Sequence, residues 1–157
     1  MDIDTIEDKK YTDSIFYETF LTGKYIKKIG EQLFCKLNFD FSAEEFAAMD
    51  FLYQSSGICQ RDLAVKMLVD RANMGKILNS LEKKGIVKRV LALKGNRPVK
   101  MVNLTKIGEE AYVDIVEELR TLLNDITDEI TENDVEVISL GLSKIRGVLG
   151  KLLKIDI

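Results

Sequence analysis

Residues 60–104 read QRDLAVKMLVDRANMGKILNSLEKKGIVKRVLALKGNRPVKMVNL. The pattern first predicts a short helix from Gln60 to Met67. Asp70 then has the short acidic side chain typical of a helix N-cap, and the helix that it begins is expected to end before Gly85. A short helix, a tight turn and a second helix predict a helix-turn-helix. The second helix has apolar residues three or four positions apart, as burial of one face requires: Met74, Ile77, Leu78 and Leu81.

Two apolar-rich extended runs follow the second helix directly. They cover residues Ile86 to Leu93 and Val99 to Leu104, and the segment between them is Lys94-Gly95-Asn96-Arg97-Pro98. Glycine, asparagine and proline favour a turn, so the pair is expected to form a hairpin with a basic tip. A hairpin at this place predicts a winged helix-turn-helix, whose second helix enters the major groove of DNA while the wing lies beside the minor groove.

The charge of the chain is concentrated in the same region. Residues 60–106 hold twelve Lys/Arg and three Asp/Glu, a balance of +9, whereas the other 110 residues have a balance of −12. A basic face on an acidic scaffold suits the phosphate backbone of a nucleic acid. A lysine-rich solvated surface would give the same charge pattern, so the charge alone leaves both interpretations open.

Long helices are expected on both sides of this region. One runs from Thr12 to Leu37, and another begins with the capping box of Ser42 and Glu45. Thr105 is expected to cap a further long helix, and the last helix follows Thr131, so the fold class is mainly α (α+β). The last helix has a seam of alternating three- and four-residue steps, which favours packing against a second chain over packing against the preceding helix. The seam residues are Val135, Ile138, Leu142, Ile145, Leu149 and Leu152.

Composition excludes most catalytic chemistry. The chain has 157 residues, which suits a single domain, and it has no histidine. The two cysteines, Cys35 and Cys59, are too few for a disulfide scaffold or a zinc site made of cysteines alone. We therefore expect neither an enzyme nor a bound metal or cofactor. The chain has no apolar run of membrane-spanning length and no basic, apolar leader at its start, so we expect no membrane partner and a cytoplasmic location.

Four segments within residues 57–108 together resemble the MarR family of winged-helix transcription regulators. They are Arg61-Asp62-Leu63-Ala64, Val69-Asp70-Arg71-Ala72-Asn73-Met74, Leu81-Glu82-Lys83-Lys84-Gly85-Ile86-Val87-Lys88-Arg89 and Val102-Asn103-Leu104-Thr105-Lys106-Ile107-Gly108.

The resemblance implies a single MarR-like domain over residues 1–157, with a DNA-binding lobe at 42–104 and helical dimerisation regions at 8–38 and 105–157. It also implies a homodimer on a pseudo-palindromic operator, usually a repressor, released by a small phenolic or lipophilic effector or by oxidation. Whether this protein represses or activates stays open. For the dimer we expect Ile15 and Phe16 to join the seam residues.

The sequence departs from the family pattern at two places. The family wing usually reads Asp-x-Arg, whereas the matching residues here are Asn96, Arg97 and Pro98. Arg97 is the natural substitute for the missing arginine, because arginine suits a narrow, electronegative minor groove. In the second helix, Gly75 stands where the family commonly has a hydroxyl residue, which loses a polar contact but lets the backbone come closer to DNA.

The buried stripe of the second helix leaves its other face for DNA. Asn73 and Lys76 have side chains suited to base edges, whereas Arg71 and Ser80 suit phosphates. An ordinary solvated helix face is the plain alternative. The predicted DNA-binding residues are Arg61, Arg71, Ala72, Asn73, Gly75, Lys76, Asn79, Ser80, Lys94, Asn96, Arg97 and Lys100.

Two features fit a signal-sensing role, and each also has a structural explanation. Cys59 falls near the N-cap of the short helix, where the helix dipole favours a thiolate, although a free cysteine, including Cys35, is more often a small apolar residue. Six aromatic residues of the first part of the chain could line an effector pocket, although aromatics at helical spacing more often form core. They are Tyr11, Phe16, Tyr17, Phe20, Tyr25 and Phe34.

A winged helix can also serve protein association without DNA. Such a wing is expected to expose apolar groups rather than Lys94, Arg97 and Lys100. The exposed residues of the wing therefore separate the two functions.

Overall fold

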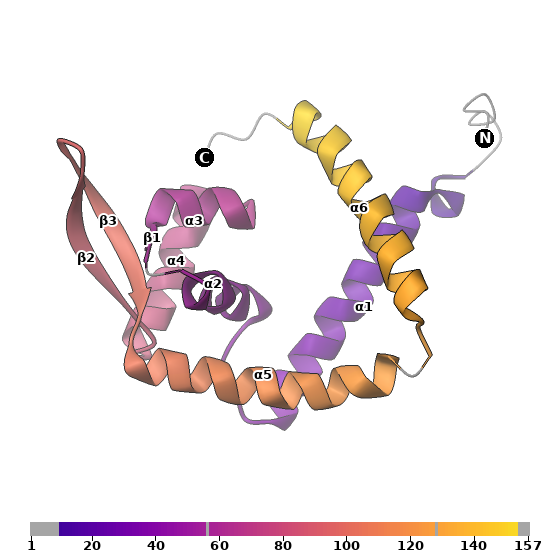
Figure 1. Cartoon of the computed structure of the whole chain (residues 1–157), viewed down its shortest axis with the longest axis horizontal. Helices are drawn as coiled ribbons and strands as arrows, with labels where there is room; N and C mark the ends of the chain where they lie inside the picture. The colour runs from indigo at the N-terminus through magenta and orange to yellow at the C-terminus, as the bar shows by residue number, and fades with distance from the viewer. Residues whose placement is uncertain (1–9, 56, 128, 154–157) are drawn as a thin grey trace. The chain divides into compact units, whose positions relative to one another are not determined.

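The computed structural model describes residues 10–55, 57–127 and 129–153. Figure 1 shows a mainly helical chain with one long hairpin. The chain divides into two compact units, Met1–Phe46 and Ala47–Ile157, and each is described by itself.

The first unit contains a 3-10 turn, η2 (Tyr11–Asp13), and the long helix α1 (Ile15–Lys36). The helix begins later than Thr12 because the Ser14 hydroxyl oxygen caps it, accepting a hydrogen bond from the backbone N–H of Tyr17 at 3.3 Å. Phe34 is the buried residue of α1, and its ring lies 5.8 Å from that of Phe46. Most other apolar side chains of α1 are exposed: Ile15, Phe16, Phe20, Tyr25, Ile26 and Ile29.

Helix α2 (Ala43–Tyr53) begins at the expected capping box. The Glu45 carboxylate accepts from the Ser42 backbone N–H at 2.8 Å, and the Ser42 hydroxyl oxygen accepts from the Glu45 N–H at 3.1 Å. The capping box predicted from the sequence is therefore confirmed.

The second unit has its core where α3 (Gln60–Met67), α4 (Arg71–Lys83) and the start of α5 (Lys106–Thr127) pack with a small sheet. All four apolar residues predicted for the inner face of α4 are buried. The largest fully buried side chains of the described residues are Met49, Leu63, Met74, Leu78, Leu81, Val102 and Ile115.

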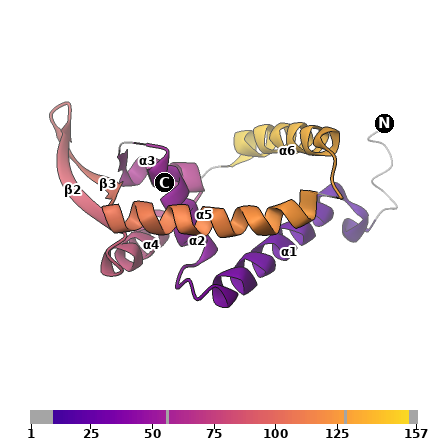
Figure 2. The ribbon, with the colours of Figure 1, turned by 60° about the horizontal axis from the view of Figure 1, so that its bottom comes forward.

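The sheet consists of β1 (Ile58–Cys59), β2 (Val87–Lys94) and β3 (Arg97–Leu104), in the order β1-β3-β2. The antiparallel register of β2 and β3 runs from Val87 opposite Leu104 to Lys94 opposite Arg97. Strands β2 and β3 form the predicted hairpin, which extends away from the helices of its unit in both views (Figures 1 and 2).

The tip of this hairpin is shorter than the five-residue turn expected from the sequence. Only Gly95 and Asn96 connect the strands, and Gly95 has the positive φ of 63° that a tight hairpin turn requires. The placement of Pro98 in the turn was wrong, since Pro98 pairs with Leu93 inside the ladder. The sheet tolerates a proline there because β1 pairs only with Met101 and Val102, so β3 has a single neighbour at Pro98.

Helix α5 is fixed to the lobe at its first turns. The Thr105 hydroxyl donates to the Gly85 carbonyl at 2.6 Å and accepts from the Gly108 N–H at 3.1 Å, as its predicted role of helix cap requires. One turn later, the Tyr112 hydroxyl donates to Asp50 on α2 at 2.6 Å. Burial, followed by this hydrogen bond, raises the pKa of Tyr112 to about 12.

Helix α6 (Glu132–Leu152) has a complete capping box, because Thr131 and Asp134 each bond the other's backbone N–H, at 3.2 and 3.0 Å. The hydrogen bond that the Thr131 hydroxyl donates to the Asp134 carboxylate at 2.6 Å, followed by the one from the Thr131 backbone N–H, lowers the pKa of Asp134. None of the described residues of α6 is buried, and within the seam only Leu142 and Ile145 are even partly covered. No element in the described part of this chain therefore buries the seam. Among the described residues, no helix is long and apolar enough to cross a membrane.

Candidate nucleic-acid interface

The turn between α3 and α4 sets the direction of the second helix. Leu68 ends α3 in a left-handed conformation with a φ of 52°, and Asp70 then accepts a hydrogen bond from the Asn73 backbone N–H at 2.7 Å. This is the N-cap predicted from the sequence. Helices α3 and α4 and the turn between them therefore form a helix-turn-helix.

The outer face of α4 is accessible along its whole length. Arg71, Ala72, Lys76 and Asn79 are exposed, whereas Asn73, Gly75 and Ser80 are half-buried. No atom lies within 4 Å of a Cβ built on Gly75, so the helix backbone is open to close approach at that point. Ala72, Lys76 and Asn79 thus lie on the side of α4 opposite its buried stripe, whereas Asn73, Gly75 and Ser80 flank that stripe.

Arg89 of β2 connects the wing to α4. Its Nη2 donates to Asn79 Oδ1 at 2.7 Å, and its Nε donates to Glu82 Oε2 at 3.1 Å. The hydrogen bond from Arg89, followed by the attraction of its charge, lowers the pKa of Glu82. The sequence reasoning did not assign this role to Arg89, because Arg89 lies on β2, its two partners lie on α4, and no short-range spacing relates the strand residue to the helix.

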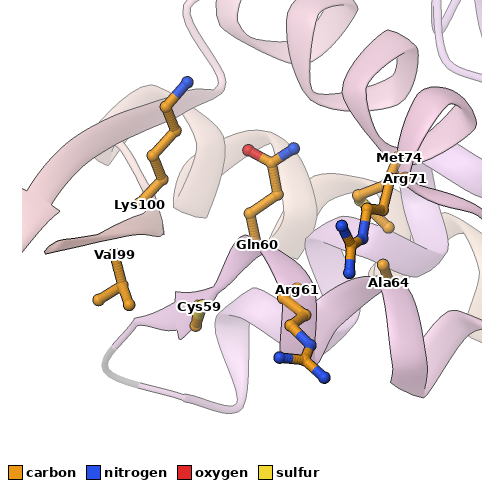
Figure 3. A pocket seen from close by; sticks show the side chains of 8 residues that line it. All are labelled: Cys59, Gln60, Arg61, Ala64, Arg71, Met74, Val99 and Lys100. Atoms are coloured by element: carbon orange, nitrogen blue, oxygen red, sulfur yellow. The ribbon is translucent and has the colours of Figure 1, made fainter. Parts of the chain in front are cut away.

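Basic side chains from three elements meet around one open pocket, which has a volume of about 440 Å³ (Figure 3). Arg61 comes from α3, Arg71 from α4 and Lys100 from β3. Among the described side chains, the Oε1 atom of Gln60 is buried without a hydrogen-bond partner. Cations at several points around an open pocket make this surface positive, which favours an anion such as a backbone phosphate. The remaining lining residues are Cys59, Gln60, Ala64, Met74 and Val99.

The tip of the wing is exposed. Asn96 lies in the two-residue connection, and Arg97 is the first residue of β3. Of the predicted basic tip residues, the side chain of Lys94 lies outside the part that the structure describes.

The two candidate redox residues, Cys59 and Cys35, lie in different parts of the chain. Cys59 is half-buried at the N-cap of α3 and makes no side-chain cap hydrogen bond there, whereas Cys35 is exposed near the end of α1. The described residues include no group of three side chains that could hold a metal ion. Among the aromatics, Tyr17 contacts both Tyr11 and Phe20, with ring centroids 5.7 and 6.3 Å apart.

Comparisons with known proteins agree with this geometry. The family model described as "Winged helix DNA-binding domain" matches residues 45–123. No curated protein sequence matches the chain. Many solved structures do, however, and three of them show what kind of fold it is.

The S. aureus MepR–DNA complex has a TM-score of 0.74 at 20% identity and covers 90% of this chain and 99% of MepR. NadR in complex with 4-hydroxyphenylacetate has a TM-score of 0.72 at 20% identity, with coverages of 89% and 100%. Wild-type MarR from E. coli, in its apo form, has a TM-score of 0.68 at 20% identity, with coverages of 84% and 96%. The matched region and the near-complete coverage lead to one conclusion: the chain belongs to the winged helix DNA-binding domain family, and it has the fold of the MarR-type regulators.

Proposed function

We propose that this protein is a sequence-specific DNA-binding transcription regulator of the MarR type, a homodimeric repressor that binds a pseudo-palindromic operator. The observation that carries the proposal is the arrangement of Arg61, Arg71 and Lys100 around one pocket beside the accessible face of α4. Cations from three elements would hold the phosphate backbone while the helix reads the major groove.

Each predicted residue has a role in this proposal. Asn73 and Lys76 contact base edges, because asparagine pairs well with adenine and lysine with the acceptors of guanine. Ala72 and Gly75 allow close approach of the helix, and Asn79 contributes its amide N–H groups while Arg89 holds its oxygen. Arg61, Arg71, Ser80 and Lys100 contact phosphates, whereas Lys94, Asn96 and Arg97 belong to the wing beside the minor groove.

The homodimer rests on the unburied apolar faces of α1 and α6. Ile15 and Phe16 are exposed on α1, and most of the seam of α6 is exposed as well. We assign these faces to a second copy of the chain, which places residues 8–38 and 105–157 in dimerisation and residues 42–104 in DNA binding. Two recognition helices one turn of DNA apart, about 34 Å, then fit a pseudo-palindrome.

Release of DNA is proposed to follow a small-molecule or redox signal. The NadR structure contains 4-hydroxyphenylacetate, which supports a small phenolic or lipophilic effector here. The half-buried Cys59 and the exposed Cys35 are the candidate redox residues. We place the protein in the cytoplasm because its proposed partner there is double-stranded DNA, and we assign it neither catalytic activity nor a cofactor.

The proposal is tested by selecting duplexes from a random-sequence pool with the purified protein at two salt concentrations. A palindrome with half-sites about 10 base pairs apart, bound more weakly at higher salt, is the expected result. Replacing Lys76 with alanine should relax the base preference within each half-site. The matched variant Lys144→Ala, an exposed lysine on α6, should leave the preference unchanged. A folded dimer that enriches no sequence at low salt would contradict the proposal.

A second candidate function, protein association through the wing, has one observation in its favour. Leu91 and Leu93 of β2 are among the most exposed apolar residues described, at 77% and 75%. An apolar wing is what a protein-binding winged helix was expected to show. The paired strand β3 carries the exposed Arg97 and Lys100. Which partner the exposed leucines bind therefore depends on how the apolar and the basic side chains are arranged.

A further inference from the structure

The wing carries an exposed apolar surface with a defined composition. Leu91 and Leu93 are two residues apart on one strand, so they lie on the same face of the hairpin. Pro98 lies directly opposite Leu93 in the ladder and is also exposed. Directly opposite residues of an antiparallel pair share a face, so the three residues form one surface. We call Leu91, Leu93 and Pro98 the wing patch.

The register also shows which way the wing patch is turned. Arg89 lies two residues before Leu91 and therefore belongs to the same face of β2. Its guanidinium reaches Asn79 and Glu82 on α4. The wing patch is thus on the same face of the hairpin as Arg89, which contacts the recognition helix α4, and not on the opposite face.

Cations lie on both faces of the neighbouring strand. Lys100 lies directly opposite Leu91 and shares the face of the wing patch, whereas Arg97, which precedes Pro98, belongs to the opposite face of β3. An apolar strip bordered by positive charge is complementary to a DNA groove, where sugar walls are bordered by phosphates. A second protein surface would have to supply an acidic group opposite Lys100, whereas a polyanion suits both Lys100 and the balance of +9 over residues 60–106.

We propose that the wing patch packs against the sugar walls of a minor groove that the wing itself widens, and this inference rests on the proposed DNA-binding function. A B-DNA minor groove is only about 6 Å wide, so a two-stranded ribbon with leucine side chains requires it to open. Apolar wedges that include leucine and proline do this in other minor-groove proteins. The cost of opening depends on the base steps, and pyrimidine–purine steps such as TA and CA/TG deform most easily. The flanks of each half-site therefore contribute to affinity through their deformability.

The test compares Leu93→Ser and Leu91→Ser with Arg97→Ala on the selected operator. Each leucine variant should lose about tenfold in affinity through the lost apolar contact, with the dependence on salt unchanged. Arg97→Ala should instead reduce the slope of log affinity against log salt by about 0.9, since one phosphate-neutralising charge is gone. Val90→Ser is the matched control, because Val90 is 44% exposed and lies on the opposite face of the same strand. It should bind like the unmodified protein.

Selection from a pool with a fixed palindrome and random flanks gives the second readout. The unmodified protein should enrich TA and CA/TG steps in the flanks, and Leu93→Ser should lose that enrichment while it keeps the palindrome. Leucine variants with unchanged affinity and unchanged flanks would overturn the wing-patch proposal and leave the DNA-binding function intact. Weaker self-association of the leucine variants with unchanged DNA affinity would also overturn the wing-patch proposal, because the patch would then bind protein. Failure of the unmodified protein to select any palindrome would reject the proposed function itself.

Discussion

Gly108 lies directly against the backbone of Ile86. A Cβ built on Gly108 would overlap the Ile86 carbonyl oxygen and lie 3.0 Å from the carbonyl carbon. The same oxygen accepts the Thr105 backbone N–H at 2.9 Å. Because Gly108 has no side chain, the first turn of α5 packs directly against the backbone of Ile86, just after the helix-turn-helix.

Replacing Gly108 with alanine should lower the free energy of unfolding by about 1–3 kcal/mol, because the backbone of Ile86 has to move. Urea unfolding measures the change. Gly75→Ala is the matched control, since Gly75 is also helical and a Cβ there meets no atom within 4 Å. Its stability should rise by up to about 1 kcal/mol through helix propensity. Equal stability for the two variants would contradict the close packing at Ile86.

Tyr112 should make folding sensitive to alkaline pH. Its folded-state pKa is raised to about 12 from the ordinary value of 10.0, so the folded protein keeps the phenol proton that the unfolded chain loses. The contribution to stability is fully present below pH 10 and is lost as pH rises from 10 to 12. Denaturant unfolding across this range should show the loss. Tyr112→Phe removes the group, so the difference between it and the unmodified protein should shrink over the same range.

Absorbance gives an independent check on Tyr112. One of the five tyrosines should ionise only near pH 12 in the folded protein, and that late step should be absent from Tyr112→Phe. If no tyrosine of the folded protein ionises near pH 12, the hydrogen bond from Tyr112 to Asp50 does not hold in solution.

Arg89 should matter more for DNA affinity than for stability. Arg89→Gln removes the hydrogen bonds to Asn79 and Glu82, but an ion pair exposed to solvent contributes little to folding. Affinity should fall by more than in Lys88→Gln, which removes the same charge from the neighbouring residue without breaking a contact to α4. Binding assays on the selected operator measure both. Equal losses in the two variants would mean that Arg89 acts only through its charge.

The same variant has a signature in acid. The pKa of Glu82 is lowered by Arg89, so the contribution of this pair to stability is present above the ordinary value of 4.5 and is lost as pH falls below it. In Arg89→Gln this loss should disappear, whereas Lys88→Gln should retain it.

Dimerisation through α6 is tested by two neighbouring residues. Ile138 belongs to the seam and is 54% exposed, whereas Val137 lies off the seam and is 61% exposed. Ile138→Asp should convert the dimer to a monomer and abolish operator binding, because a carboxylate would be buried in the interface. Val137→Asp should preserve both properties. Sedimentation velocity measures the assembly, and a dimeric Ile138→Asp variant would show that the seam is not the interface.

Local patterns predicted the helices well. The predicted caps at Ser42, Asp70 and Thr105 each bond a backbone N–H three residues on, so the sequence contains the whole interaction. The buried face of α4 likewise follows from spacing alone, and all four expected residues are in the core.

Features that depend on pairing between elements were not predictable in the same way. The predicted turn was too long, because Gly, Asn and Pro each favour turns, whereas the strand pairing places Pro98 opposite Leu93. Residues 90–93, Val-Leu-Ala-Leu, do not alternate between apolar and polar, so the sequence assigns no inner face to that strand. The exposed leucines and the Arg89 contacts therefore emerged only with the register of the hairpin.

The lack of any buried residue among those described in α6 has a consequence for how the regulator responds to its own abundance. A helix that buries nothing within its own chain gains its stability by mass action from association. If the seam pairs two chains, halving the cellular amount of protein lowers both the number of molecules and the fraction assembled. Operator occupancy then changes more steeply than protein dose, so a cell can release its target genes by diluting the protein as it grows.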